Sequence, residues 1–202
     1  MDLHFDALLC DIDGVLRIWD PEIMAGAEKA HGLPAGTLPA AAFAPHRLVP
    51  AITGEVTDEQ WRAAVVEDLA AEHGEQAARA AVAAWTAGAG VVDAEVLELL
   101  TAVREHAKVV LVSNATSRLE DDLAALGLAD AVDAIVNTSR IGWAKPDPRV
   151  YEHAARVAGV PPQRCLFVDD TEKNVIAARE TGMQGLYYRT PADLRAILEA
   201  AG

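Results

Sequence analysis

The chain has 202 residues, of which 51% are hydrophobic and 24% charged, so it holds enough apolar material for a sizeable core in one or two domains. Its 31 acidic residues outnumber its 17 basic residues, which gives a formal net charge of −14. Because this charge repels nucleic acid phosphates and anionic lipid surfaces, we expect neither a nucleic acid nor a membrane as a partner.

Cysteine and histidine usage points away from a disulfide scaffold and from a zinc site. The two cysteines, Cys10 and Cys165, lie in apolar strand-like runs, and we expect both to be buried free thiols. The six histidines are scattered without paired ligand spacing. The N-terminal residues lack the charged-then-apolar layout of a signal peptide, so we expect a cytoplasmic protein.

The first predicted element is a strand over Ala7–Ile12, and the residues that follow it predict a helical insert. Thr57 and Gln60 match a capping box at the start of one of its helices. The Pro- and Ala-rich residues 33–50 show no clear helical pattern. We therefore predict two units, which are a helical insert over residues 17–89 and an α/β core formed by residues 1–16 and 90–202.

Beyond residue 93, short apolar runs alternate with helical patterns. The predicted strands are Val109–Val112, Ala134–Val136, Cys165–Val168 and Leu186–Tyr188. The residues expected to cap the intervening helices are Asp93, Thr116, Asp147 and Thr171. Continuous apolarity is typical of strands covered on both faces, so this alternation predicts a doubly wound, parallel α/β sheet.

Polar side chains follow three of the predicted strands at their carboxyl ends. They are Asp11 and Asp13 after the first strand, Ser113 and Asn114 after the second, and Asp169 and Asp170 after the fourth. Since the carboxyl ends of parallel strands share one edge of a sheet, four carboxylates would crowd one crevice.

Crowded carboxylates repel each other unless a cation neutralises them, and an all-oxygen site of this kind suits Mg²⁺. Ser113 can donate a hydrogen bond to an anion in the same crevice. Lys145, which precedes a predicted helix N-terminus, can add a positive charge beside that anion. Together these groups predict a phosphoryl-transfer centre.

Four motifs occur in order along the chain: Asp11-x-Asp13-Gly-Val, Ser113-Asn114, Lys145-Pro and Asp169-Asp170-x-x-x-Asn174. This series resembles the motifs of the haloacid dehalogenase superfamily over the whole chain. The predicted insert resembles the helical cap of the subclass whose cap lies between motifs one and two. The resemblance implies a Rossmann-like parallel sheet of order 5-4-1-2-3, with the strands numbered along the chain.

The resemblance also implies roles for the residues of the first three motifs. Asp11 would be the nucleophile, would form an aspartyl-phosphate and would bind Mg²⁺. Asp13 would be the general acid/base and would offer its backbone carbonyl to the metal. Ser113, Asn114 and Lys145 would hold the transferring phosphoryl group.

In the fourth motif, the resemblance implies that Asp170 binds Mg²⁺ directly and that Asp169 helps directly or through water. Asn174 departs from the acidic residue that many members have at this position, so we expect it to orient the site rather than to bind the metal. Arg17, where the chain leaves for the insert, and Trp143, close to Lys145, are candidate substrate contacts.

Asp13 favours a phosphatase over a 2-haloacid dehalogenase, because a leaving alkoxide needs a proton whereas a leaving halide does not. A phosphomutase with the same core remains an alternative. A phospho-accepting regulatory module is a non-enzymatic alternative. Such modules carry their acidic pair after the first strand, whereas the adjacent acids of this chain follow the fourth predicted strand. We expect a small phosphorylated metabolite with a neutral polyol or short organic body as substrate, and we leave open whether the protein is a monomer or a homodimer.

Overall fold

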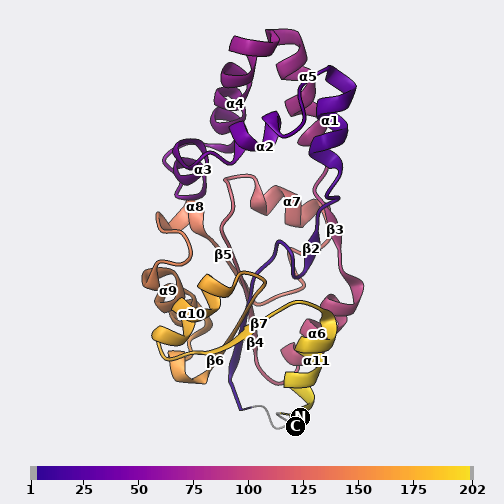
Figure 1. The fold of residues 1–202 in the computed structure, drawn as a ribbon. Coiled ribbons are helices and arrows are strands. Elements are labelled where there is room, and N and C mark those ends of the chain that lie inside the picture. Colours follow the sequence, from indigo (N-terminus) through magenta and orange to yellow (C-terminus); the bar gives the residue numbers. More distant parts are fainter. Residues whose placement is uncertain (1–3, 201–202) are drawn as a thin grey trace.

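A five-stranded parallel sheet forms the centre of the computed structural model, which describes residues 4–200 (Figure 1). Its strands are β1 (Ala7–Cys10), β4 (Lys108–Ser113), β5 (Ala134–Asn137), β6 (Cys165–Asp169) and β7 (Gln184–Tyr187). The spatial order is β5-β4-β1-β6-β7, which confirms the predicted order 5-4-1-2-3 and the Rossmann-like α/β class. β1 is the central strand and is buried along its whole length.

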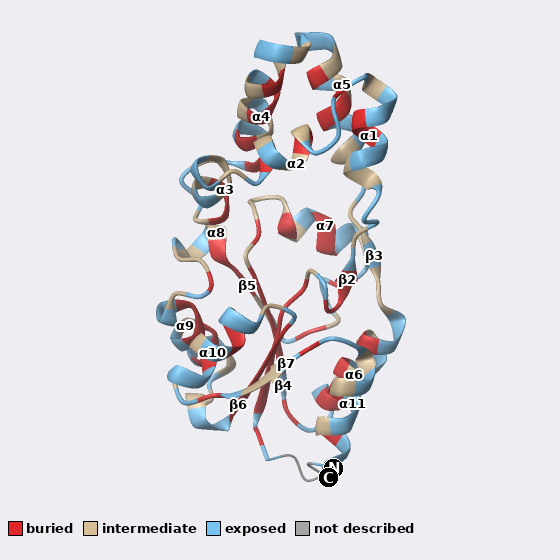
Figure 2. Ribbon diagram, viewed as in Figure 1, coloured by how far each residue is buried: buried red, intermediate tan, exposed pale blue. Residues whose placement is uncertain are grey.

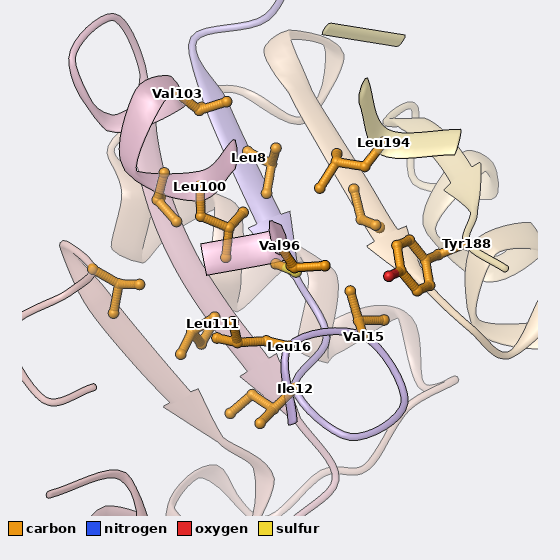
Figure 3. Close-up of a cluster of buried hydrophobic side chains, with 14 of the residues drawn as sticks. Leu8, Ile12, Val15, Leu16, Val96, Leu100, Val103, Leu111, Tyr188 and Leu194 are labelled. Atoms are coloured by element: carbon orange, nitrogen blue, oxygen red, sulfur yellow. The ribbon is translucent and has the colours of Figure 1, made fainter. Parts of the chain in front are cut away.

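Helices cover both faces of the sheet. One face carries α6 (Ala94–Arg104), α7 (Leu119–Ala125) and α11 (Pro191–Ala200), and the other carries α9 (Pro148–Ala158) and α10 (Glu172–Glu180). The connections include α8 (Thr138–Ile141) and the 3₁₀ turn η1 (Pro162–Arg164). Figure 3 shows the first face, where Leu8 and Leu111 from the strands meet Leu100 and Leu194 from the helices. Ala7 and Leu9 belong to the cluster on the opposite face, because successive strand side chains alternate.

A helical insert separates β2 (Arg17–Ile18) from β3 (Val91–Val92), two short strands that pair antiparallel. Its helices are α1 (Ile23–His31), α2 (Thr37–Ala42), α3 (Pro45–Ile52), α4 (Asp58–His73) and α5 (Glu75–Trp85). They stand beyond the sheet edge, at the top of Figure 1. The predicted capping box at the start of α4 is confirmed, because Thr57 and Gln60 each accept a backbone N–H of the other.

The insert has a hydrophobic core of its own, which includes Leu38, Trp61 and Val65. Figure 2 shows that the buried residues of α4, α5 and α1 line the inner faces of these helices. Among the described residues, the two clusters on the sheet contain only residues from outside the insert. The sheet core and the insert therefore bury apolar surface independently of each other.

Among the predictions at element ends, those for Ile12, Thr116 and Thr171 differ from the structure for local reasons. β1 ends at Cys10 rather than Ile12, because the chain turns at Ile12, whose carbonyl accepts the N–H groups of Val15, Leu16 and Arg17. Thr116 does not begin a helix, since α7 starts at Leu119 and the Thr116 hydroxyl donates to Asp58 in the insert. The Thr171 side chain does not accept a capping hydrogen bond from α10, and its hydroxyl instead donates to Asp170 Oδ1.

Residues 33–50, which show no clear pattern in sequence, contain α2 and most of α3. Gly54, just after α3, lies against the core: a Cβ there would come within 2.0 Å of the Ser139 carbonyl oxygen. Asp58 makes a second contact, because its N–H donates to the Ser117 hydroxyl over 2.9 Å. The insert is thus held on the loop after β4 and on α8. Over residues 4–200, none of the helices is both long enough and apolar enough to cross a membrane.

Candidate active site

The polar residues predicted at the strand ends meet around one cavity of about 260 Å³. The loops after β1, β4 and β6 supply most of its wall, which is formed by Asp11, Asp13, Ser113, Asn114, Lys145, Asp170, Thr171, Lys173 and Asn174. Residues more than 150 positions apart in the chain therefore share one crevice, as the parallel topology requires.

Lys145 is the buried cation at the floor of this cavity. Its Nζ lies 2.8 Å from Asp11 Oδ1 and 2.7 Å from Asp169 Oδ2, and it donates to the Val112 carbonyl over 3.0 Å. Burial alone would lower the pKa of Lys145, but the charges of Asp11 and Asp169 outweigh burial and raise it. Lys145 is therefore a permanent ammonium group whose three protons face three oxygen atoms.

Asn114 fixes the backbone that carries Lys145. Its Oδ1 accepts the Lys145 N–H over 2.7 Å, and its Nδ2 donates to the Lys145 carbonyl over 2.9 Å. This paired contact sets the position of the Lys145 segment against the end of β4. The phosphate contact predicted for Asn114 remains a prediction. Ser113, which is the last residue of β4, also lines the cavity.

Asp169 lies beneath the cavity and is fully buried. Lys145 contacts its Oδ2, Asn174 Nδ2 lies 3.1 Å from each of its oxygens, and the Thr171 N–H donates to its Oδ1. Protein donors thus surround both oxygens of Asp169. Asn174 thus contacts this carboxylate, and the orienting role expected for it stays a prediction.

Asp11 and Asp170 are, with Asp13, the carboxylates that line the cavity. Burial raises the pKa of Asp11 to about 7, although Lys145 opposes the shift, and Asp169 adds to it. Burial and then the charge of Asp169 raise the pKa of Asp170 as well. Proton uptake thus becomes easier at both carboxylates, first because they are buried and then because one lysine does not balance three acids.

This imbalance is what a divalent cation would relieve. Asp11, Asp169 and Asp170 each offer a carboxylate oxygen, and these oxygens lie within 4.8 Å of one another. Asn174 Oδ1 is buried in the same place and has no hydrogen-bond partner among residues 4–200. Hard oxygen donors at this spacing fit Mg²⁺, which binds through one or two carboxylates and keeps several waters.

Gly14 explains the close approach of the first and fourth motifs. Its φ of +83° lies in the left-handed region, and a Cβ at this position would come within 2.1 Å of Asp170 Oδ2. Only glycine therefore allows the turn after Asp13 to lie against the Asp170 carboxylate.

Asp13 is held by two residues at the entrance to the insert. Arg17 donates to both carboxylate oxygens over 2.6 and 3.0 Å, and the Trp19 indole N–H donates to Oδ1 over 2.7 Å. Arg17 also reaches Asp122 on α7 over 3.3 Å. Arg17 is buried, and its guanidinium group holds the Asp13 carboxylate in place. Sequence reasoning did not identify Trp19 and Asp122 as part of the site, because neither residue lies in one of the four motifs or at the end of a predicted strand.

A second cavity of about 370 Å³ lies between the insert and the core. Asp13 and Asn114 line both cavities, so the two adjoin at these residues. Arg17 lines the larger cavity. Trp143, by contrast, lies outside the lining of both cavities: its ring lies 4.8 Å from the Arg149 guanidinium and packs against the core cluster beside α9. We expected Trp143 to lie at the crevice, but the structure places it outside both cavity walls.

Comparisons with known proteins agree with this geometry. A family model described as haloacid dehalogenase-like hydrolase matches residues 5–182. The chain is 34% identical over 88 residues to haloacid dehalogenase-like hydrolase domain-containing protein 3 of Bos taurus, covering 43% of this chain and 35% of that protein. It is 38% identical over 86 residues to phosphatase MT3486 of Mycobacterium tuberculosis, covering 37% of this chain and 40% of that protein. The match thus spans less than half the length of these curated relatives.

A solved structure extends the likeness to nearly the whole chain. It is a HAD family enzyme from Bacteroides thetaiotaomicron in complex with magnesium and inorganic phosphate. The superposition has a TM-score of 0.74 at 22% identity and covers 92% of this chain and 94% of that chain. At this identity, the likeness shows a shared fold.

Proposed function

Because the chain belongs to the haloacid dehalogenase-like hydrolases, we propose that it is a Mg²⁺-dependent phosphatase that hydrolyses small phosphomonoesters. The observation that carries the proposal is Asp13, a second carboxylate two residues after Asp11, placed where the two cavities adjoin. Two comparisons support it: one relative is named a phosphatase, and one enzyme of the same fold binds magnesium and phosphate.

The reaction has two steps that use the same two carboxylates. In the first, an Asp11 oxygen attacks phosphorus, the ester P–O bond breaks, and Asp13 gives its proton to the leaving alkoxide. In the second, Asp13 takes a proton from water, the water oxygen attacks phosphorus, and the bond from phosphorus to Asp11 breaks. One positioned carboxyl group acting as acid and then as base contributes about 10²–10⁴-fold.

The remaining groups hold the reactants in place. Lys145 fixes the Asp11 carboxylate through a 2.8 Å contact, and Asn114 and Asp169 fix Lys145 in turn. Ser113 is placed to donate to a phosphoryl oxygen. Asp11 and Asp170 would hold Mg²⁺, which supplies positive charge that offsets the repulsion between these acids and a phosphate dianion.

The test is phosphate release from a panel of phosphomonoesters with Mg²⁺, run beside 2-chloropropionate and a hexose-1-phosphate mutase assay. We expect phosphate release that stops in excess chelator and returns with added Mg²⁺. Asp11→Asn should reduce it to background and should not incorporate phosphate, whereas wild-type protein should carry phosphate on the Asp11 peptide after rapid quenching.

Asp13→Asn separates the two steps. With p-nitrophenyl phosphate, whose leaving group needs no proton, we expect one equivalent of nitrophenol and then a stall, because no base activates the water. Dehalogenation of 2-chloropropionate that is undiminished in chelator, or a mutase activity exceeding phosphate release, would contradict the phosphatase assignment in favour of the corresponding alternative.

A further inference from the structure

The larger cavity is the space into which the body of a bound phosphomonoester extends. Asp13 lies in the walls of both cavities, and in the proposed reaction its carboxyl group protonates the oxygen that joins phosphorus to that body. A molecule whose phosphate occupies the smaller cavity therefore places the rest of its atoms against the wall of the larger one. The chemistry of this wall then selects the substrate.

The side of the wall formed by the insert is largely apolar, although it also carries the carboxylates of Asp20 and Asp58. Ile23, Met24, Phe43, Leu48, Trp61 and Trp85 all line it. Three of these rings pack edge to face, with centroids 6.0 Å apart for Phe43 and Trp85 and 5.4 Å apart for Trp61 and Trp85. Phe43 nevertheless remains 48% exposed, so much of its ring is open to a ligand.

The polar groups of the same wall already have partners. Arg118 donates to Asp122 and to the carbonyls of Thr86 and Gly88 over 2.7–2.8 Å. Arg17 donates hydrogen bonds to Asp13 and to Asp122. The same holds for three further residues of the wall: the Trp19 indole donates to Asp13, the Trp61 indole donates to the Ala42 carbonyl, and Asp58 contacts Thr116 and Arg62.

A polyol in this cavity would lose its hydrogen bonds to water and find few free partners in exchange. An apolar body would lose none and would bury the exposed surface of Phe43 and its neighbours. A second phosphate would find both lining arginines already paired with carboxylates.

We propose that the substrates of this protein are phosphomonoesters with a single phosphate and an apolar body, either aromatic or aliphatic, which packs on the Phe43–Trp61–Trp85 surface. This inference rests on the proposed function and names its substrate class. It narrows the neutral polyol or short organic body expected from the sequence to an apolar body.

The first experiment compares cyclohexylmethyl phosphate with glucose 6-phosphate in the presence of Mg²⁺. Both esters release a primary alkoxide attached to a six-membered ring, and they differ mainly in the ring hydroxyls. We expect kcat/KM to be at least about tenfold higher for the cyclohexylmethyl ester, because the site lacks partners for hydroxyl groups. Calorimetric binding of the two esters to the inactive Asp11→Asn protein should show the same order of affinity.

The second experiment changes the apolar surface. Phe43→Asn should raise KM for the cyclohexylmethyl ester and reduce the preference between the two esters by about tenfold. Val49→Asn is the matched control, because Val49 is nearly as exposed at 47%, lies on the neighbouring helix α3 of the insert, and does not line the cavity. This control should leave the preference unchanged.

The outcomes separate this inference from the proposed function. Equal or better hydrolysis and binding of glucose 6-phosphate would overturn the apolar substrate class and leave the phosphatase standing. The absence of Mg²⁺-dependent phosphate release from every ester tested would overturn both. If Phe43→Asn fails to fold, the affinities of the two esters for Asp11→Asn protein decide the question.

Discussion

At the scale of single residues, Lys145 controls the charge balance of the site. It is fully buried, and its ammonium group contacts two carboxylates that are themselves buried. Removing one partner from such a cluster leaves charges that neither water nor protein neutralises, and the cost of this is far larger than the net contribution of an exposed pair.

We therefore expect Lys145→Met to lower the free energy of unfolding by about 3–5 kcal/mol. Lys108→Met is the control: Lys108 pairs with Asp133 over 3.2 Å but is largely exposed, so its loss should cost about 0–1 kcal/mol. Urea unfolding in excess chelator measures both variants without a contribution from bound metal. Equal losses for the two lysines would show that the Asp11–Lys145–Asp169 cluster is not the buried charge network described here.

At the scale of elements, the pairing of β1 with β6 determines the fate of the two thiols. Cys10 lies opposite Val168 and Cys165 lies opposite Ala7, so the cysteines are three residues out of register. At about 3.3 Å per residue this is an offset of about 10 Å, whereas a disulfide needs Cα atoms within about 7 Å. The register confirms the prediction that both cysteines are free.

Both thiols should be unreactive in the folded protein. Burial raises the pKa of Cys165 to about 11 and raises that of Cys10 further, so near pH 8 neither forms the thiolate that reacts with disulfide reagents. A thiol-reactive chromogenic disulfide should titrate almost no thiol in native protein and two per chain in denaturant without reductant. Fewer than two in denaturant would reveal a Cys10–Cys165 bridge and contradict the strand register.

For the whole molecule, the sheet and the polar strand ends could be predicted from the sequence because each depends on local pattern plus one topological rule. The apolar runs identified the strands, and parallel strands must bring Asp11, Ser113 and Asp170 to one edge. The contacts of Arg17 could not be predicted in this way. Its partner Asp122 lies 105 residues away on α7, and no local pattern indicates that the two residues meet.

The arrangement of the insert helices could not be predicted from the sequence either. Helices α2 and α3 are short and Pro-containing, so they carry no long amphipathic period, and their positions follow from packing on α4. The apolar surface formed by Phe43, Trp61 and Trp85 combines residues from three parts of the insert. No local sequence pattern joins these three residues or indicates that one side of their rings faces a cavity.

The separate cores of the insert and the sheet lead to a prediction for the molecule as a whole. The clusters on the sheet contain no described residue of the helical insert, and the insert has a cluster of its own. The chain leaves and returns through β2 and β3, in which Ile18 pairs with Val91. The ends created by removing residues 20–88 therefore lie close enough for a short linker, and the entropy of closing such a loop is small.

We expect the protein lacking residues 20–88 to keep its parallel sheet and to unfold cooperatively, as followed by circular dichroism during urea titration. Its cleavage of p-nitrophenyl phosphate should persist, since Asp11, Lys145 and Asp170 come from the core. Its preference between cyclohexylmethyl phosphate and glucose 6-phosphate should collapse, because the aromatic surface is gone. A truncated protein that folds and still discriminates between these esters would place specificity in the core, and one without a cooperative transition would show that the two units do not fold independently.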